Sequence, residues 1–208
     1  ENEVTPGPKE NEFSKRLKVF DKFVVSFAGN LGTSQDIRVI LDSAQLLSDY
    51  QDIIFLIVGD GVKKETSVEI AKNRNLKNVI FLPMQTKSVY PKILHSSDIS
   101  LATLEKEVKT PVVPSKILSI MSAGKPVLAT MNLDGDAPEL IKKAECGYVF
   151  EAGDSKSLAN AILQLYQNED LRKKLGGNGR KYIEEYLSVK TAAEKYEKLF
   201  TEVINKNK

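Results

Sequence analysis

Two short loops of this sequence combine the residue types that bind an anion. The first is residues 29–32, Gly-Asn-Leu-Gly, which follow an apolar run and precede a helical pattern. The glycines let the backbone approach a ligand closely, and the following helix offers free N–H groups and the positive end of its dipole. The loop suits a phosphate, although it matches neither a G-x-G-x-x-G fingerprint nor a P-loop. The alternative is a tight turn that binds nothing, before a helix that Thr33 and Asp36 start as a capping box.

The second loop, residues 113–117 (Val-Pro-Ser-Lys-Ile), opens another helical pattern. Pro114 suits a first helical turn, Ser115 can cap the helix, and Lys116 adds a full positive charge to the partial charge of the dipole. A diphosphate needs several donors and a cation converging on it, so this loop is the stronger anion site. The alternative is an ordinary capped helix with a solvated lysine.

Other reactive residue types favour structural roles. Asp134 and Asp136 form a D-x-D pattern that can bind a metal, but Asp136 also stands three residues before Glu139, which is typical of a helix start. A magnesium site needs more than one short acidic turn, so we expect no metal site and no cofactor. Cys146 has no histidine arranged to activate it, and His95 follows an apolar pair near a predicted helix end. We expect both to be structural.

Composition narrows the class of protein further. The chain has 208 residues, with 30 lysines and arginines, 28 acidic residues and 41% hydrophobic residues. These values fit one compact globular unit and give no reason to expect a nucleic-acid partner. One cysteine excludes an intrachain disulfide framework, and no apolar run approaches the ~20 residues that span a bilayer. The chain begins with Glu1 in a polar stretch that is not a signal peptide, so we expect a piece of a longer protein.

Six short apolar runs alternate with helical patterns along the chain. Because the runs are apolar throughout, they are typical of strands buried on both faces. Strands separated by helices predict an α/β fold, a doubly wound (Rossmann-like) parallel sheet flanked by helices, with an all-helical C-terminal extension. The predicted strands are 23–28, 53–58, 78–82, 98–103, 126–130 and 148–150, and the predicted helices are 37–47, 63–74, 88–95, 116–123, 139–145, 155–166, 169–175, 180–186 and 191–204.

Three segments follow from this pattern. Residues 1–20 are expected to form a linker or a tail over the surface, since residues 6–8 read Pro-Gly-Pro in a polar stretch without periodicity. Residues 21–187 form the Rossmann-like domain, with a break at the Gly-Gly-Asn-Gly of residues 176–179. Residues 188–208 form a C-terminal helix. In such sheets ligands bind beyond the carboxyl ends of the strands. The first anion loop directly follows strand 23–28, and the second lies between strand 98–103 and the next helix, so we expect both loops at this edge.

The motifs resemble a known family when they are taken together. In order, they are the 29–32 loop, LIVGDG (56–61), NVIFLP (78–83), VPSKILSIMSAGKPVLA (113–129) and PELI…GYVF (138–150). This series resembles the C-terminal, donor-binding domain of a GT-B fold glycosyltransferase of the retaining family-4 type. It is most similar to the branch that builds bacterial capsule, O-antigen or exopolysaccharide. The resemblance covers residues 23–200, and it implies one half of a GT-B fold.

The resemblance implies a function and a site. The domain would bind a nucleotide-sugar, such as a UDP-sugar, and Lys116 would be the catalytic group that stabilises the leaving diphosphate. Transfer would need no metal and would retain configuration, while the fragment alone would be inactive. The acceptor would be a lipid-linked saccharide held by an N-terminal domain in the full-length chain, at the cytoplasmic face of the membrane. The implied donor-binding residues are Gly29, Asn30, Leu31, Gly32, Leu82, Pro83, Met84, Pro114, Ser115, Lys116, Ile117 and Ser119.

The sequence also departs from the family pattern. Many members have two glutamates eight residues apart, and these positions fall on Pro111 and Ser119 here. The arginine and lysine of the first loop are replaced by Asn30 and Gln35, so Lys116 must hold more of the diphosphate charge. Glu105 and Glu107 are candidates to reach the sugar. Two alternatives stay open: a non-catalytic nucleotide-binding or sugar-nucleotide-binding module on the same fold, and a flavodoxin-like regulatory domain.

Overall fold

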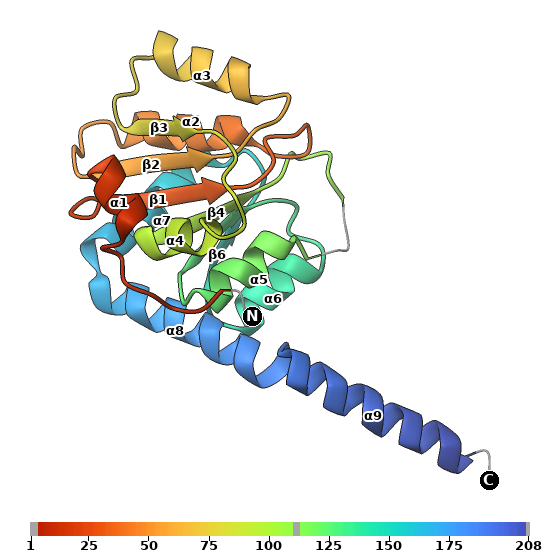
Figure 1. The fold of residues 1–208 in the computed structure, drawn as a ribbon. Coiled ribbons are helices and arrows are strands. Elements are labelled where there is room, and N and C mark those ends of the chain that lie inside the picture. The colour runs from red at the N-terminus through yellow and green to blue at the C-terminus, as the bar shows by residue number, and fades with distance from the viewer. Residues whose placement is uncertain (1–3, 110–112, 207–208) are drawn as a thin grey trace.

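The computed structural model of the chain describes residues 4–109 and 113–206. Six parallel strands form one sheet in the spatial order β3-β2-β1-β4-β5-β6 (Figure 1). The connectivity runs outward from β1 to one edge and then outward from β4 to the other. The strands are β1 (Phe23–Ala28), β2 (Ile53–Val58), β3 (Val79–Leu82), β4 (Ile99–Thr103), β5 (Val127–Thr130) and β6 (Gly147–Phe150).

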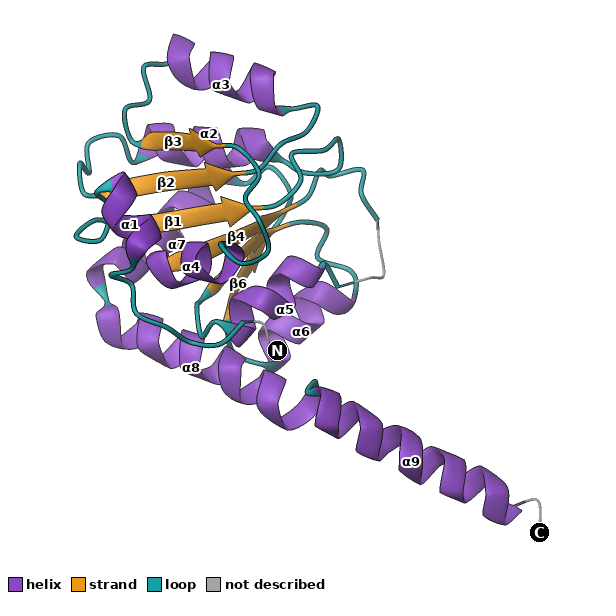
Figure 2. Ribbon diagram, in the orientation of Figure 1, coloured by secondary structure: helices purple, strands orange, loops and turns teal. Residues whose placement is uncertain are grey.

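Helices cover both faces of the sheet, as Figure 2 shows, and this confirms the predicted fold class. One core cluster lies between the sheet and helices α2, α3 and α7, and two others lie on the opposite face under α1, α4, α5 and α6. Every residue of β1 and β4 is buried, which explains their largely apolar sequences, and the Ser26 and Ser100 hydroxyls within them pair with each other at 2.8 Å. The helices are α1 (Glu12–Leu17), α2 (Ile37–Leu46), α3 (Lys64–Asn73), α4 (Tyr90–Ser96), α5 (Ser115–Ser122), α6 (Asp136–Lys143), α7 (Ser155–Gln167), α8 (Glu169–Tyr186) and α9 (Val189–Lys206).

The strand order places a ligand site. Strands β1 and β4 are neighbours, and the chain leaves them toward opposite edges of the sheet. Such a switch point opens a crevice beyond the carboxyl ends of the two strands, because the loops that follow them diverge. The loop after β1 is the predicted first anion loop, so the topology brings it to the centre of this edge.

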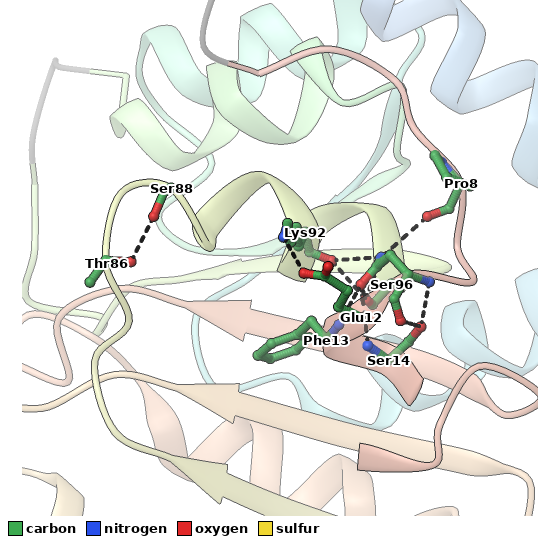
Figure 3. A network of polar contacts seen from close by, with 9 residues as sticks. Pro8, Glu12, Phe13, Ser14, Thr86, Ser88, Lys92 and Ser96 are labelled. Carbon is green, nitrogen blue, oxygen red and sulfur yellow. Dashed lines mark hydrogen bonds and ion pairs between the residues drawn. The ribbon is translucent and has the colours of Figure 1, made fainter. Parts of the chain in front are cut away.

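The predicted N-terminal linker or tail contains a helix. The segment does run over the surface, but α1 packs against α4 and buries Phe13 to 3% exposure. Asn11 caps α1 by accepting from the backbone N–H groups of Phe13 and Ser14. Its amide nitrogen donates to the Lys92 carbonyl (3.2 Å) and to the Ser96 hydroxyl (3.0 Å) on α4. We call Asn11, Ser14, Lys92 and Ser96 the N-terminal clasp; Figure 3 shows its setting.

The predicted break at residues 176–179 is wrong, because α8 runs through it as one helix from Glu169 to Tyr186. A Cβ on Gly176 would lie 2.1 Å from the carbonyl oxygen of Gly124, and one on Gly179 would lie 3.0 Å from the Cβ of Cys146. The glycines therefore allow α8 to touch the turn after α5, and burial of the helix offsets their low helical propensity. The Gly-Gly-Asn-Gly pattern therefore marks the place where α8 lies close to the end of α5.

Helix α9 follows α8 and extends away from the domain in Figure 1. It begins at Val189, two residues before the predicted start. Large apolar side chains along it are 49–61% exposed, including Tyr196, Leu199, Phe200 and Val203. None of the helices in the described ranges has the length and apolar character needed to cross a membrane.

Candidate functional site

One pocket of about 600 Å³ opens at the carboxyl edge of the sheet. Ala28 and Val58, the last residues of β1 and β2, form its floor, and the loop after β1, the loop before α4 and the start of α5 form its walls. Of the residues predicted to bind the donor, Gly29, Asn30, Met84, Pro114, Ser115, Lys116 and Ser119 line it, whereas Leu31, Gly32, Leu82, Pro83 and Ile117 lie outside its lining. The structure thus brings the two predicted anion loops together.

The first loop presents backbone at Gly29 and Asn30. Gly29 has a φ of +146°, and a Cβ there would lie 3.3 Å from the ammonium nitrogen of Lys116. Leu31 differs from the prediction because it points into the core, where it is fully buried, and its N–H donates to the carbonyl of Asp60. Gly59 lies under the loop, since a Cβ there would lie 1.9 Å from the Gly29 carbonyl oxygen. Glycine at both positions is what lets the loop lie low over the sheet.

The helix after the first loop is capped differently from the prediction. Asp36, not Thr33, is the N-cap residue of α2, and its carboxylate accepts from the N–H of Val39 at 2.9 Å. Burial raises the pKa of this carboxyl group, while the bond from Val39 opposes the shift. The cap satisfies the start of α2 internally, so the end of this helix is not the open anion site.

The start of α5 does remain open to the pocket. Pro114 takes the N-cap position and Ser115 the first helical one, so the predicted cap by Ser115 is wrong; no side chain within the described ranges caps this helix. Ser115 is exposed, and its N–H faces the end of the helix where a dipole favours an anion. The predicted role of the Ile117 amide is corrected, because this residue is buried and its N–H donates to the Pro114 carbonyl.

Lys116 supplies the cation at this opening. Its ammonium donates to Oε1 of Gln35 at 2.8 Å and lies 3.6 Å from the centroid of the Phe27 ring. Burial lowers the pKa of Lys116 to about 7, because a charged amine loses hydration in the protein interior. Near neutral pH the group is therefore close to its titration midpoint, and an incoming anion would stabilise the charged form.

A second set of contacts holds the loop that carries Gln35. The ammonium of Lys63 donates to the Gln35 carbonyl at 2.8 Å and pairs with the carboxylate of Glu105. The N–H of Glu105 donates to the Ser34 carbonyl at 3.0 Å. Glu105, a candidate to reach the sugar, thus serves as a brace for this loop and lies outside the pocket lining, as does the exposed Glu107.

The opposite wall carries Met84, one of the residues that the resemblance implies as donor-binding. The N–H of Met84 donates to the carboxylate of Asp60 at 2.6 Å, so this amide already has a partner. A hydrogen bond from Lys64 and a second from Met84 lower the pKa of Asp60. Met84 faces the pocket with a half-exposed side chain, whereas Leu82 belongs to β3 and packs against the core under α1 and α4.

Several lining residues were not predicted from the sequence. Tyr90 opens α4, and burial raises the pKa of its phenol while a hydrogen-bond contribution from Ser119 opposes that shift. Gln85 and Lys87 come from the loop after β3, which the rule of strand ends does select. Val4 also lines the pocket, but it could not be predicted because a single valine in a polar segment shows no periodicity.

The remaining reactive groups are structural where they are described. Cys146 is fully buried, and burial raises the pKa of its thiol to about 12. His95 lies 2.7 Å from the Thr5 carbonyl through Nε2. Helix α6 begins at Asp136, three residues before the predicted start, and its N-cap is Gly135 without a side-chain bond, so Asp136 lies in the first turn and does not cap the helix. Within residues 4–109 and 113–206, no three His, Cys, Asp or Glu side chains gather to form a metal site. Pro111 lies outside the described residues.

This sheet order, with a pocket at its switch point, defines a doubly wound α/β domain of the Rossmann-like kind. Residues 8–182 match the model of the family described as glycosyl transferases group 1. The chain therefore belongs to this family of GT-B, family-4 type glycosyltransferases, and the predicted family is confirmed.

Individual relatives agree with this assignment. The chain is 30% identical over 158 residues to an N-acetyl-alpha-D-glucosaminyl L-malate synthase of Bacillus anthracis, covering 76% of this chain and 39% of that protein. It is 28% identical over 200 residues to the probable glycosyltransferase WbjE of Pseudomonas aeruginosa, covering 94% of this chain and 48% of that protein. The chain thus spans about half or less of the relatives it matches.

A solved structure shows the same fold. The crystal structure of Anabaena Alr3699/HepE in complex with UDP superposes with a TM-score of 0.83 at 20% identity, covering 97% of this chain and 55% of that one. At this identity the likeness concerns the fold, which is one half of the GT-B architecture.

Proposed function

We propose that this chain is the donor-binding half of a glycosyltransferase that takes a UDP-sugar. One observation carries the proposal: Lys116 and the open start of α5 face the Gly29 loop across a single pocket at the switch point of the sheet. A diphosphate in this pocket would meet backbone N–H groups, a helix dipole and one ammonium group together. The UDP bound in the HepE structure supports a uridine nucleotide.

In the proposed reaction, Lys116 and the α5 backbone stabilise the charge that develops on the leaving UDP. Donors that are already oriented do this without reorganisation when the glycosidic bond breaks. We propose transfer without a metal ion and with retention of configuration, as the family resemblance implies. No histidine or carboxylate stands among the described lining residues, so this half would not turn over alone.

The acceptor belongs to the part of a longer protein that this chain does not cover. The chain covers 39% and 48% of two named relatives, which leaves room for an acceptor domain. We propose that the exposed apolar side of α9 packs toward that domain, since Tyr196, Leu199 and Phe200 are 51–61% exposed. Relatives named for colanic acid and capsular polysaccharide biosynthesis support a role in polysaccharide biosynthesis. From the family resemblance, we propose a lipid-linked saccharide as the acceptor, at the cytoplasmic face of the membrane.

A second function is favoured by one observation. Ser119 stands where many family members have a glutamate that binds the ribose, and a serine hydroxyl lacks the second oxygen through which a carboxylate accepts as a bidentate group. A nucleotide-binding module without transferase activity would tolerate this change. Turnover of a UDP-sugar by the full-length protein would exclude this alternative, whereas UDP binding without turnover would favour it.

The first test is a UDP titration followed by amide NMR, in EDTA and then with Mg²⁺. We expect saturable shifts at residues 29–35 and 114–119 that are the same with and without metal. Lys116→Ala should weaken binding by about 100-fold, because a hydrogen-bonded charge contact contributes roughly 1.5–3 kcal/mol. Lys72→Ala, which removes an exposed lysine on α3, is the matched control and should leave the affinity unchanged. Absence of shifts at millimolar UDP would contradict the proposal for this chain.

A further inference from the structure

Gln35 contacts the cation of the pocket directly. Its Oε1 accepts from the Lys116 ammonium at 2.8 Å, and both residues line the pocket. An ammonium group can only donate, so the carbonyl oxygen of the amide must face Lys116. The amide nitrogen then points the other way, where it lies 3.3 Å from the Ser34 hydroxyl. The side chain is thus oriented by chemistry at both ends.

The backbone under Gln35 is fixed as well. Lys63 binds the Gln35 carbonyl, and Glu105 both pairs with Lys63 and donates its N–H to the Ser34 carbonyl. The next residue, Asp36, is the buried N-cap of α2. Lys63, Glu105 and the N-cap of α2 therefore hold residues 34–35 in place. From this segment, the Gln35 side chain is the one that contacts Lys116. This is the arrangement of a support rather than of a mobile surface residue.

The Lys116 ammonium has few other restraints. On one side it lies over the Phe27 ring, and on another it approaches the Gly29 backbone. Neither contact fixes the direction of its N–H bonds, because a ring face and a Cα offer no directional acceptor. The charged groups around the pair are Lys63 with its partner Glu105, the Asp36 carboxyl group, and Lys87 on the far wall of the pocket.

We propose that Gln35 is a positioning residue that holds the Lys116 ammonium at the pocket. With this restraint, a single cation is enough for the site to bind a nucleoside diphosphate. This inference rests on the proposed function of the pocket. A lysine at position 35 would set two ammonium groups against each other within hydrogen-bond distance, whereas the amide attracts the one that is present.

Three variants test this role. Gln35→Leu removes the acceptor at nearly constant volume, and Gln35→Glu keeps the acceptor and adds a negative charge. Gln45→Leu makes the same chemical change at an exposed position of α2 and serves as the control. In each protein without ligand, the Lys116 side chain is titrated by NMR of labelled lysine, with the signal assigned by its loss in Lys116→Arg. UDP affinity is then measured by calorimetry.

We expect the pKa of Lys116 to fall in Gln35→Leu and to rise in Gln35→Glu, because a hydrogen bond and a negative charge both favour the charged amine. UDP affinity should fall about tenfold in Gln35→Leu and remain unchanged in Gln45→Leu. A Lys116 titration that is the same in all three variants would overturn the inference, even if UDP binds. If no variant and no wild-type protein binds UDP, the proposed function fails, and the ligand-free titration still decides whether Gln35 holds Lys116.

Discussion

Helix α4 lies between two polar regions that differ in how far their hydrogen-bonding groups are paired within the protein. On its outer side, the N-terminal clasp pairs nearly all of its polar atoms with one another: the Asn11 side chain alone has partners on α1, on the preceding turn and on α4. At its other end, Tyr90 borders the pocket, where the start of α5 has no side-chain cap and Lys116 is close to its titration midpoint. Satisfied groups stabilise the fold, and unsatisfied ones at an open pocket remain for a ligand.

The comparison predicts that damage to the clasp affects stability and leaves binding alone. Asn11→Ala removes an N-cap and several partly buried hydrogen bonds, so we expect a loss of about 2 kcal/mol in the free energy of unfolding, measured by urea denaturation. UDP affinity of the folded protein should stay within twofold. Asn160→Ala, at an exposed position of α7, is the control and should change stability little. A parallel loss of UDP affinity in Asn11→Ala would show that the two regions are coupled through α4.

A smaller effect is expected in the pH dependence of UDP affinity, which involves the pocket and not the clasp. The pKa of Lys116 is about 7 in the free protein, and a bound diphosphate should raise it, so binding takes up protons near pH 7. UDP affinity should then fall by up to about tenfold per pH unit above pH 7, until the pKa of the complex is reached. Calorimetry in buffers of different ionisation enthalpy should show uptake of roughly half a proton at pH 7. Release of protons, or no exchange, would contradict the assignment of Lys116 to the diphosphate.

The same group changes stability in the opposite direction. Its pKa in the folded state lies below the ordinary value of 10.5, so the unfolded chain binds more protons between about pH 7 and pH 10.5. Stability without ligand should therefore rise with pH in this range, because folding no longer places a charge in a buried site. Lys116→Met should remove that rise, whereas the clasp variant Asn11→Ala should keep it.

The smallest effect is expected at the edge of the clasp. Glu12 and Lys92 form an ion pair, drawn in Figure 3. Its charged atoms lie 2.6 Å apart, but the carboxylate is highly exposed to water. Exposed pairs contribute little because water and salt screen them. Glu12→Gln should leave both the thermal midpoint and the UDP affinity unchanged within error. A clear loss of stability at low salt that disappears at high salt would assign this pair a larger role.

Sequence alone predicted the sheet because each strand is a short, largely apolar run without polar alternation. Residues 23–28 and 53–58 match β1 and β2 at both ends, and the fold class follows from their alternation with helices. The glycines of 176–179 could not be interpreted in the same way. Their meaning depends on the carbonyl of Gly124, which is distant in sequence and near only after folding.

The sequence predicted the groups of the site that could bind an anion, but it predicted fewer of the residues that form the pocket walls. Gly29 and Lys116 stand out by residue type at strand and helix ends, and the pocket contains both. Leu31 and Ile117 belong to the same motifs but face the core, Leu31 through the path of the loop after β1 and Ile117 through the helical period of α5. Tyr90 gave no signal on its own, because its position beside Ser119 depends on how α4 packs next to α5.

Val4 has a consequence for engineering of this family. It lies upstream of every helix and strand, yet it forms part of the pocket wall and packs with the core around α5. A chimaera that exchanges this domain between relatives should therefore be joined before Val4. A fusion made at Phe23, where the first strand begins, would bring a foreign wall to the nucleotide and would leave α4 without the helix that fits it.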